Sequence, residues 1–120
     1  MWMISREGFF SAVAVNNSRV QVRARRQTDL KNLRKFDIRG RIIVTPDADY
    51  PFRVITSKTL WAAATAKMSR SINYDNFKNE VKLTDKDRAE IYTEVWRVLR
   101  DLEKPFLGKD CRMLLHLPKG

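Results

Sequence analysis

The clearest pattern in the chain is a strict alternation of apolar and polar positions over residues 19–25. Val20, Val22 and Ala24 occupy every second position, and polar residues stand between them. Because successive side chains of a strand point to opposite faces, this alternation predicts a half-buried antiparallel strand with the apolar residues on the core. The opposite face would carry polar side chains spaced about 7 Å apart, namely Arg19, Gln21, Arg23 and Arg25.

The segments on either side of this strand predict a hairpin and a helix. Residues 8–15 combine small, aromatic and β-branched side chains, and Asn16-Asn17 suits the positive φ angles of a tight turn. After the strand, Thr28 is a candidate helix N-cap. Apolar residues then recur at three-residue spacing, at Leu30, Leu33 and Phe36. Residues 9–36 therefore predict strand, turn, strand and capped helix.

The same order of elements is expected over residues 41–70. Residues 41–45 and 50–55 are rich in β-branched and aromatic side chains, and proline and aspartates between them favour a turn. Thr56 or Ser57 can cap the helix that follows. Its apolar positions lie one turn apart, at Leu60, Ala64 and Met68.

Two more helices are predicted in the second half of the chain. The first begins at Asn73 or Asp75, and the second begins near Thr84. The second helix carries an apolar seam, formed by Ile91, Val95, Val98 and Leu102. Beyond it, residues 111–117 fit either an edge strand or an ordered tail.

These elements predict an α+β fold in which two β-hairpins form a sheet of about four strands, with helices packed on one face. The order is ββαββα, followed by two further helices. With 120 residues, the chain is expected to form one globular domain over residues 1–120. Residues 1–104 would form its core, and residues 105–120 a tail or an extra edge strand.

Positive charge is concentrated around the alternating strand. The formal net charge of the chain is +10, and the segment from Arg19 to Arg41 holds nine basic residues against Asp29 and Asp37. The arginines on the strand can keep a polar sheet face hydrated and prevent edge pairing with other chains. They can also form a platform for phosphate groups or an acidic protein surface. The contact candidates are Arg19, Arg23, Arg25, Arg26, Arg34 and Lys35.

Three classes of function are compatible with this pattern. The leading hypothesis is a small non-enzymatic binding module whose basic face engages nucleic acid or a nucleoprotein assembly. The second is an inhibitor or adaptor encoded by a phage or another mobile element, which binds an acidic site on a host protein such as a defence-system component. The third is an enzyme of an unrecognised type. Phe10, Tyr50 and Phe52 fit either base stacking or the core.

The residues that common enzyme mechanisms require are scarce. The chain has one histidine, His116, and one cysteine, Cys111, which supply neither a histidine-dependent triad nor a familiar zinc set. The four separated glycines form no phosphate-binding loop. We therefore predict no catalytic residue, no metal ligand and no cofactor.

The sequence also predicts a cytoplasmic protein without membrane association. A single cysteine excludes an intramolecular disulfide bond. The first residues lack the order of a secretory signal, and no apolar run approaches the roughly 20 residues that span a bilayer.

Several separated motifs resemble a small family of uncharacterised bacterial and phage proteins. They are Trp2 with Gly8-Phe9-Phe10-Ser11, Val22-Arg23-Ala24-Arg25 with Asp29-Leu30, Tyr50-Pro51-Phe52-Arg53, Asn73-Tyr74-Asp75-Asn76-Phe77-Lys78, and Tyr92 with Val95-Trp96. The resemblance covers most of the chain. It implies a single domain with its hairpins and helices in this order, and it transfers no activity and no functional residue.

Overall fold

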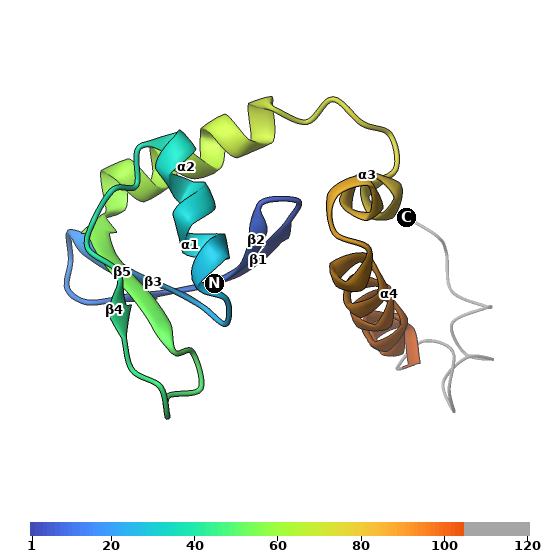
Figure 1. Cartoon of the computed structure of the whole chain (residues 1–120), viewed down its shortest axis with the longest axis horizontal. Coiled ribbons are helices and arrows are strands. Elements are labelled where there is room, and N and C mark those ends of the chain that lie inside the picture. Colours follow the sequence, from blue (N-terminus) through green and yellow to red (C-terminus); the bar gives the residue numbers. More distant parts are fainter. Residues whose placement is uncertain (105–120) are drawn as a thin grey trace, which may run out of the picture. The chain divides into compact units, whose positions relative to one another are not determined.

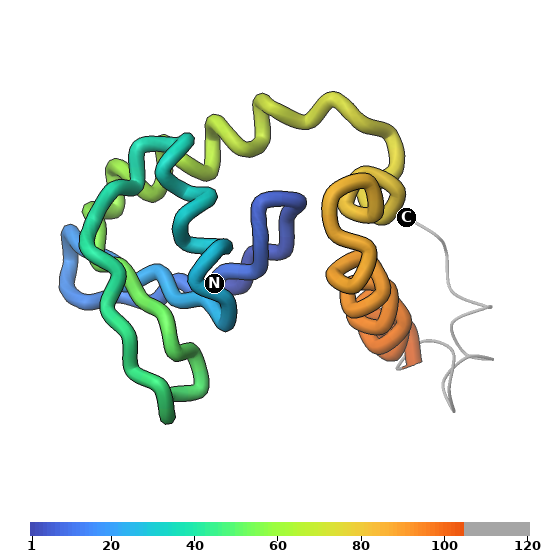
Figure 2. Tube along the Cα trace, viewed as in Figure 1, coloured from blue at the N-terminus to red at the C-terminus, as the bar shows by residue number. Residues whose placement is uncertain are grey.

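The structure, a computed structural model, describes residues 1–104 (Figures 1 and 2). The chain divides into two units, Met1–Asn73 and Tyr74–Gly120, and each unit is described by itself. Whether both units act as one globular domain over residues 1–120 stays a prediction. The proposed tail at 105–120 and the proposed edge strand at 111–117 lie outside the described residues.

A five-stranded antiparallel sheet forms the first unit, together with the helices that cover it, and this confirms the predicted α+β fold. The strands are β1 (Trp2–Ser5), β2 (Gly8–Ala14), β3 (Arg19–Ala24), β4 (Ile43–Val44) and β5 (Phe52–Ser57). Their spatial order is β1-β2-β3-β5-β4, with every neighbouring pair antiparallel. The alternating strand, β3, is therefore the central strand of the sheet.

The sheet differs from the predicted one in two details. The prediction of four strands missed β1, which pairs with β2 across a turn of two residues. The hydroxyl of Ser5 holds this turn, since it donates to the carbonyl of Gly8 at 3.3 Å and accepts from the amide of Glu7 at 3.2 Å. In addition, β4 contains only two residues, although a strand was expected over residues 41–45.

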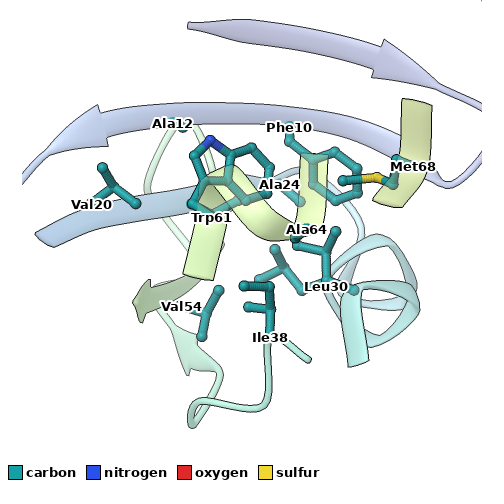
Figure 3. Packing of buried hydrophobic residues seen from close by; sticks show 12 residues of the cluster. Phe10, Ala12, Val20, Ala24, Leu30, Ile38, Val54, Trp61, Ala64 and Met68 are labelled. Carbon is teal, nitrogen blue, oxygen red and sulfur yellow. The ribbon is translucent and has the colours of Figure 1, made fainter. Parts of the chain in front are cut away.

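Helices α1 (Gln27–Asn32), η1 (Leu33–Phe36) and α2 (Lys58–Arg70) cover one face of the sheet (Figure 1). Their apolar side chains meet those of β2, β3 and β5 in one continuous core (Figure 3). Complete burial of a Leu, Val or Phe side chain contributes about 1.5–3 kcal/mol. The buried residues are Phe10, Ala12, Val20, Val22, Ala24, Leu30, Leu33, Ile38, Val54, Trp61, Ala64 and Met68.

The structure confirms a predicted N-cap for α2 but not the predicted N-cap for α1. The Ser57 hydroxyl accepts from the amide of Leu60 at 3.0 Å, which confirms one predicted cap. The prediction of Thr28 is wrong, because α1 begins at Gln27 and its N-cap, Arg26, makes no capping hydrogen bond through its side chain. The acidic residue in the first turn, Asp29, is buried and accepts from the amide of Phe9 at 3.1 Å. The hydrogen bond between Phe9 of β2 and Asp29 therefore fixes the start of α1 in place of a side-chain N-cap.

The absence of a side chain at Gly8 makes this link possible. Gly8 has a φ angle of +153°, and a Cβ atom placed on it would lie 2.5 Å from Cγ of Asp29. A larger residue at this position would collide with the carboxylate that anchors α1. The start of β2 and the start of α1 therefore fit together only around glycine.

The described part of the second unit is helical. It contains α3 (Phe77–Thr84), α4 (Lys86–Leu99) and η2 (Arg100–Glu103). Asn76, not Asn73 or Asp75 as predicted, caps α3 by accepting from the amide of Asn79 at 3.0 Å, because Asn76 has extended backbone angles and the helix begins only at Phe77. Asp85 caps α4, close to the predicted start at Thr84.

The predicted apolar seam of α4 is not the face that packs on α3. The two helices meet through buried Val81, Ala89 and Tyr92, and the rings of Phe77 and Tyr92 stack with centroids 5.7 Å apart. The described conformation leaves most of the seam exposed, at Ile91, Val98 and Leu102. In residues 1–104, no helix has the length and the apolar character needed to cross a bilayer.

The two predicted caps provide a matched pair for a stability test. We expect Ser57→Ala to lower the free energy of unfolding by about 1 kcal/mol, because the amide of Leu60 loses its acceptor. Thr28→Ala removes a hydroxyl that makes no cap and should change that free energy by less than about 0.5 kcal/mol. Urea unfolding of both variants measures the difference. Equal losses would contradict the observed caps.

Candidate functional site

The face of the sheet opposite the helices carries the arginines predicted to form a contact surface. On β3, Val20, Val22 and Ala24 are buried under the helices, so the side chains between them point to the other face. The pairing register places further residues on this second face. We call it the arginine face and define it by Trp2, Ile4, Phe9, Ser11, Val13, Arg19, Gln21, Arg23, Ile43, Arg53 and Ile55.

One row of the arginine face crosses all five strands. Trp2 pairs with Ser11, Ser11 with Arg23, Arg23 with Arg53, and Arg53 with Ile43. Directly paired residues of an antiparallel sheet share a face and have Cβ atoms about 4.5–5.5 Å apart. The row therefore places an exposed tryptophan, a serine and two adjacent arginines in one line.

Arg23 is held at the centre of this row by neutral groups. Its side chain is half-buried, its Nη2 donates to Oγ of Ser11 at 2.7 Å, and its guanidinium carbon lies 4.6 Å from the ring centroid of Tyr50. The buried Nε has no acceptor among the described residues. A guanidinium offers five N–H donors. The protein thus orients Arg23 while leaving most of its donors unused.

Tyr50, which lies before β5, contacts three arginines. The guanidinium of Arg25 lies 5.0 Å from its ring centroid, and its carbonyl accepts from Nε of Arg53 at 3.3 Å. The ring also contacts Arg23, and Tyr50 is 5% exposed. The negative potential above an aromatic ring attracts cations, each such contact contributing about 0.5–1 kcal/mol at exposed sites and more when desolvated.

Arg23 and Arg53 form a like-charge pair without an opposing carboxylate. They are direct partners across β3 and β5, an arrangement that is unfavourable for equal charges. In residues 1–104, no aspartate or glutamate forms an ion pair with Arg19, Arg23 or Arg53. A bound anion would relieve the repulsion between the paired arginines.

Arg25, which follows β3, forms an exposed ion pair with Asp49. Its Nη2 lies 3.3 Å from Oδ1 of Asp49, and both side chains are largely exposed. Exposed pairs of this kind contribute about 0–1 kcal/mol, because water screens them and two long side chains must be ordered. Asp49 therefore neutralises only one side of the arginine face, and only weakly.

The six predicted contact residues fall into two groups that lie on different sides of the sheet. Arg19 and Arg23 belong to the arginine face, and Arg25, just beyond β3, borders it through its contact with Tyr50. Arg26 follows as the exposed N-cap of α1. Arg34 and Lys35 are exposed on η1, whose Leu33 packs into the core on the opposite side of the sheet. These two residues therefore do not extend the arginine face, although they are close to it in sequence.

On the helix side of the first unit, some lysines and arginines form ion pairs with a carboxylate. Lys67 donates to Oδ2 of Asp37 at 2.5 Å, and Arg39 lies 3.7 Å from its other oxygen. The hydrogen bond from Lys67, with its charge, holds the pKa of Asp37 below its ordinary value, and Arg39 adds to this effect. The helix side of the first unit thus has a carboxylate of its own, unlike the Arg23–Arg53 pair.

Net charge also distinguishes the two units. Met1–Asn73 contains 14 lysines and arginines against five aspartates and glutamates, which gives +9. Tyr74–Gly120 contains ten against nine, which gives +1. Nearly all the excess positive charge of the chain therefore belongs to the unit that carries the arginine face.

The sequence leaves three aromatic residues open to base stacking or the core, and two of them pack in or against the core. Of the three candidates, Phe10 is completely buried and Phe52 packs against the core, while Tyr50 contacts the arginines. Trp2 packs edge-to-face on Phe9 at 5.9 Å, and Phe9 lies 6.2 Å from Tyr50. The arginine face therefore combines guanidinium groups with a connected series of aromatic rings.

Sequence reasoning did not identify Arg53, Ser11 and Trp2 as members of the site. The alternation in β5 could have placed Arg53 opposite the buried Val54, but its pairing with Arg23 depends on the register between distant strands. In residues 1–104, no group of three histidines, cysteines or carboxylates is arranged to hold a metal ion. The guanidinium groups and aromatic rings of this face can bind anions and stack on planar groups.

Comparison with known proteins gives no functional assignment. No family model, no curated protein and no solved structure matches the chain. The resemblance to uncharacterised bacterial and phage proteins therefore stays a prediction.

Tyr50 tests whether the arginines depend on an aromatic ring. We expect Tyr50→Leu to lower the free energy of unfolding by about 1–2 kcal/mol beyond Tyr50→Phe, because leucine offers no negative ring face to Arg23 and Arg25. Tyr50→Phe keeps the ring and serves as the control. Urea unfolding measures both variants. A leucine variant as stable as the phenylalanine variant would show that the ring contacts contribute nothing.

Proposed function

We propose that this protein is a small non-enzymatic module that binds nucleic acid, alone or in a nucleoprotein assembly, through the arginine face. The observation that carries the proposal is the direct pairing of Arg23 with Arg53 without a described carboxylate beside them. Phosphate groups are the anions that such a pair suits best, because guanidinium forks match phosphate oxygens in geometry and charge.

The neighbouring arginines extend the surface along a nucleic-acid backbone. Arg19 lies four residues from Arg23 on the same strand, which corresponds to about 13 Å, and Arg25 lies about 7 Å beyond Arg23 on the other side. Several phosphates of one chain could thus be contacted at once. Phosphate contacts position a protein without reading sequence, so the proposal predicts binding with little sequence preference.

The proposal includes a cytoplasmic location, which the single cysteine supports. The inhibitor or adaptor hypothesis remains an alternative, since an acidic protein surface presents the same sign of charge. No arrangement of side chains in residues 1–104 specifically favours that hypothesis or an enzyme. A protein partner would be revealed if acidic proteins, but not nucleic acids, competed for the arginine face.

A pair of charge-matched variants tests the proposal. Arg23→Gln/Arg53→Gln removes two positive charges from the arginine face, and Arg34→Gln/Lys35→Gln removes two from η1. We expect the first variant alone to weaken binding of a labelled oligonucleotide strongly and to reduce the slope of log affinity against log salt by about two. Fluorescence anisotropy between about 50 and 200 mM salt measures this.

Two results would contradict the proposal. One is equal weakening by both double variants, which would indicate a response to net charge alone. The other is no binding of DNA or RNA by the unmodified protein at low salt. Arg19→Gln, at an exposed position of β3, provides a further variant of the arginine face if the half-buried pair proves necessary for folding.

A further inference from the structure

We propose that the arginine face binds a single strand, with one base stacked on the indole of Trp2 and a phosphate held by Arg23 and Arg53. This inference rests on the proposed function and specifies its ligand. It uses an observation that phosphate binding alone does not require, namely an exposed aromatic ring in the same row as the paired arginines.

Trp2 has no role in the core that would explain its position. Its side chain lies on the arginine face of β1 and is 73% exposed, whereas Trp61, the tryptophan of the core, is 6% exposed. Exposed aromatic rings beside basic side chains on a sheet are typical of surfaces on which bases stack. Most of the flat, apolar indole surface of Trp2 is therefore accessible to a ligand.

The pairing register sets the distance between the stacking surface and the phosphate site. Trp2 and Arg23 are separated by one strand, so their backbones lie about 10 Å apart. The residue between them, Ser11, is small and buried, and its hydroxyl accepts a hydrogen bond from Arg23. A nucleotide carries its base and its phosphate on opposite sides of a sugar. It could thus extend along this row with the sugar above the serine.

The indole is supported from below by a second ring. Phe9 meets Trp2 edge-to-face, with an interplanar angle of 89°, and Phe9 in turn packs on Tyr50 beneath the arginines. Edge-to-face ring pairs contribute about 0.5–1.5 kcal/mol beyond the area that they bury. This support restricts the indole before a ligand arrives, which reduces the entropy lost on binding.

A single strand uses these features better than a duplex does. In a duplex the flat surfaces of the bases are stacked on each other, so the arginines would contact phosphates while Trp2 stayed unused. In a single strand the bases are free to stack on aromatic side chains, and any base suffices because every base has a π-face. The arginine face therefore suits a single strand with little sequence preference.

The test compares two labelled strands of equal length and phosphate number, one of oligothymidylate and one in which every base is absent. The unmodified protein should bind the base-bearing strand more tightly. Trp2→Leu, which keeps an apolar side chain on β1, should weaken binding of that strand about 5- to 100-fold and leave binding of the abasic strand unchanged. The salt dependence should not change, because no phosphate contact is lost.

Two variants control for folding and for the loss of tryptophan in general. Trp2→Phe should restore most of the preference for the base-bearing strand, because it returns an aromatic ring to the same position. Trp96→Leu removes the half-exposed tryptophan of the second unit and should leave both affinities unchanged. A duplex of equal phosphate number should bind Trp2→Leu and the unmodified protein equally well.

The outcomes separate this inference from the proposed function. If Trp2→Leu affects both strands equally or neither, while Arg23→Gln/Arg53→Gln still weakens both, stacking on Trp2 is wrong and phosphate binding stands. If the unmodified protein binds neither strand at low salt, both proposals are wrong. A preference for the base-bearing strand that Trp2→Leu abolishes and Trp2→Phe restores would support both.

Discussion

Two arginines held side by side at the centre of the sheet are the constraint on which this account depends. Arg23 and Arg53 are direct partners across β3 and β5, where equal charges repel. The protein tolerates the pair by giving Arg23 the ring of Tyr50 and the hydroxyl of Ser11, and by giving Arg53 the Tyr50 carbonyl. These neutral groups orient the guanidinium groups without cancelling their charge, which leaves the pair prepared for an anion.

The fold creates this pair by dividing the sheet into two different faces. The helices bury Val20, Val22 and Ala24 on one face, so the residues between them must point to the other. Asp29, seated against Gly8, anchors α1 to the start of β2 and keeps the helix layer on its side. The cost of placing several cations together is thus offset by the hydrophobic core on the opposite face.

Local patterns predicted the parts of this arrangement that depend on neighbouring residues. The alternation in residues 19–25 correctly assigned the two faces of β3, and Ser57 caps α2 as expected. The site itself depends on pairing between distant segments, which no local pattern reports. Arg53 joins Arg23 only through the β3–β5 register, and Trp2 joins the row only because β1 adds to the sheet edge. Helical spacing could place Arg34 away from the core but could not show on which side of the sheet it lies.

Arginine side-chain NMR observes individual guanidinium groups directly. Titration of the isotope-labelled protein with an unlabelled oligonucleotide would follow the Nε–Hε signal of each arginine. The account predicts the largest changes at Arg23 and Arg53, with little change at Arg34 on η1, because the bound phosphate lies on the arginine face. Changes that are largest at Arg34, or that are spread evenly over all the arginines, would contradict it.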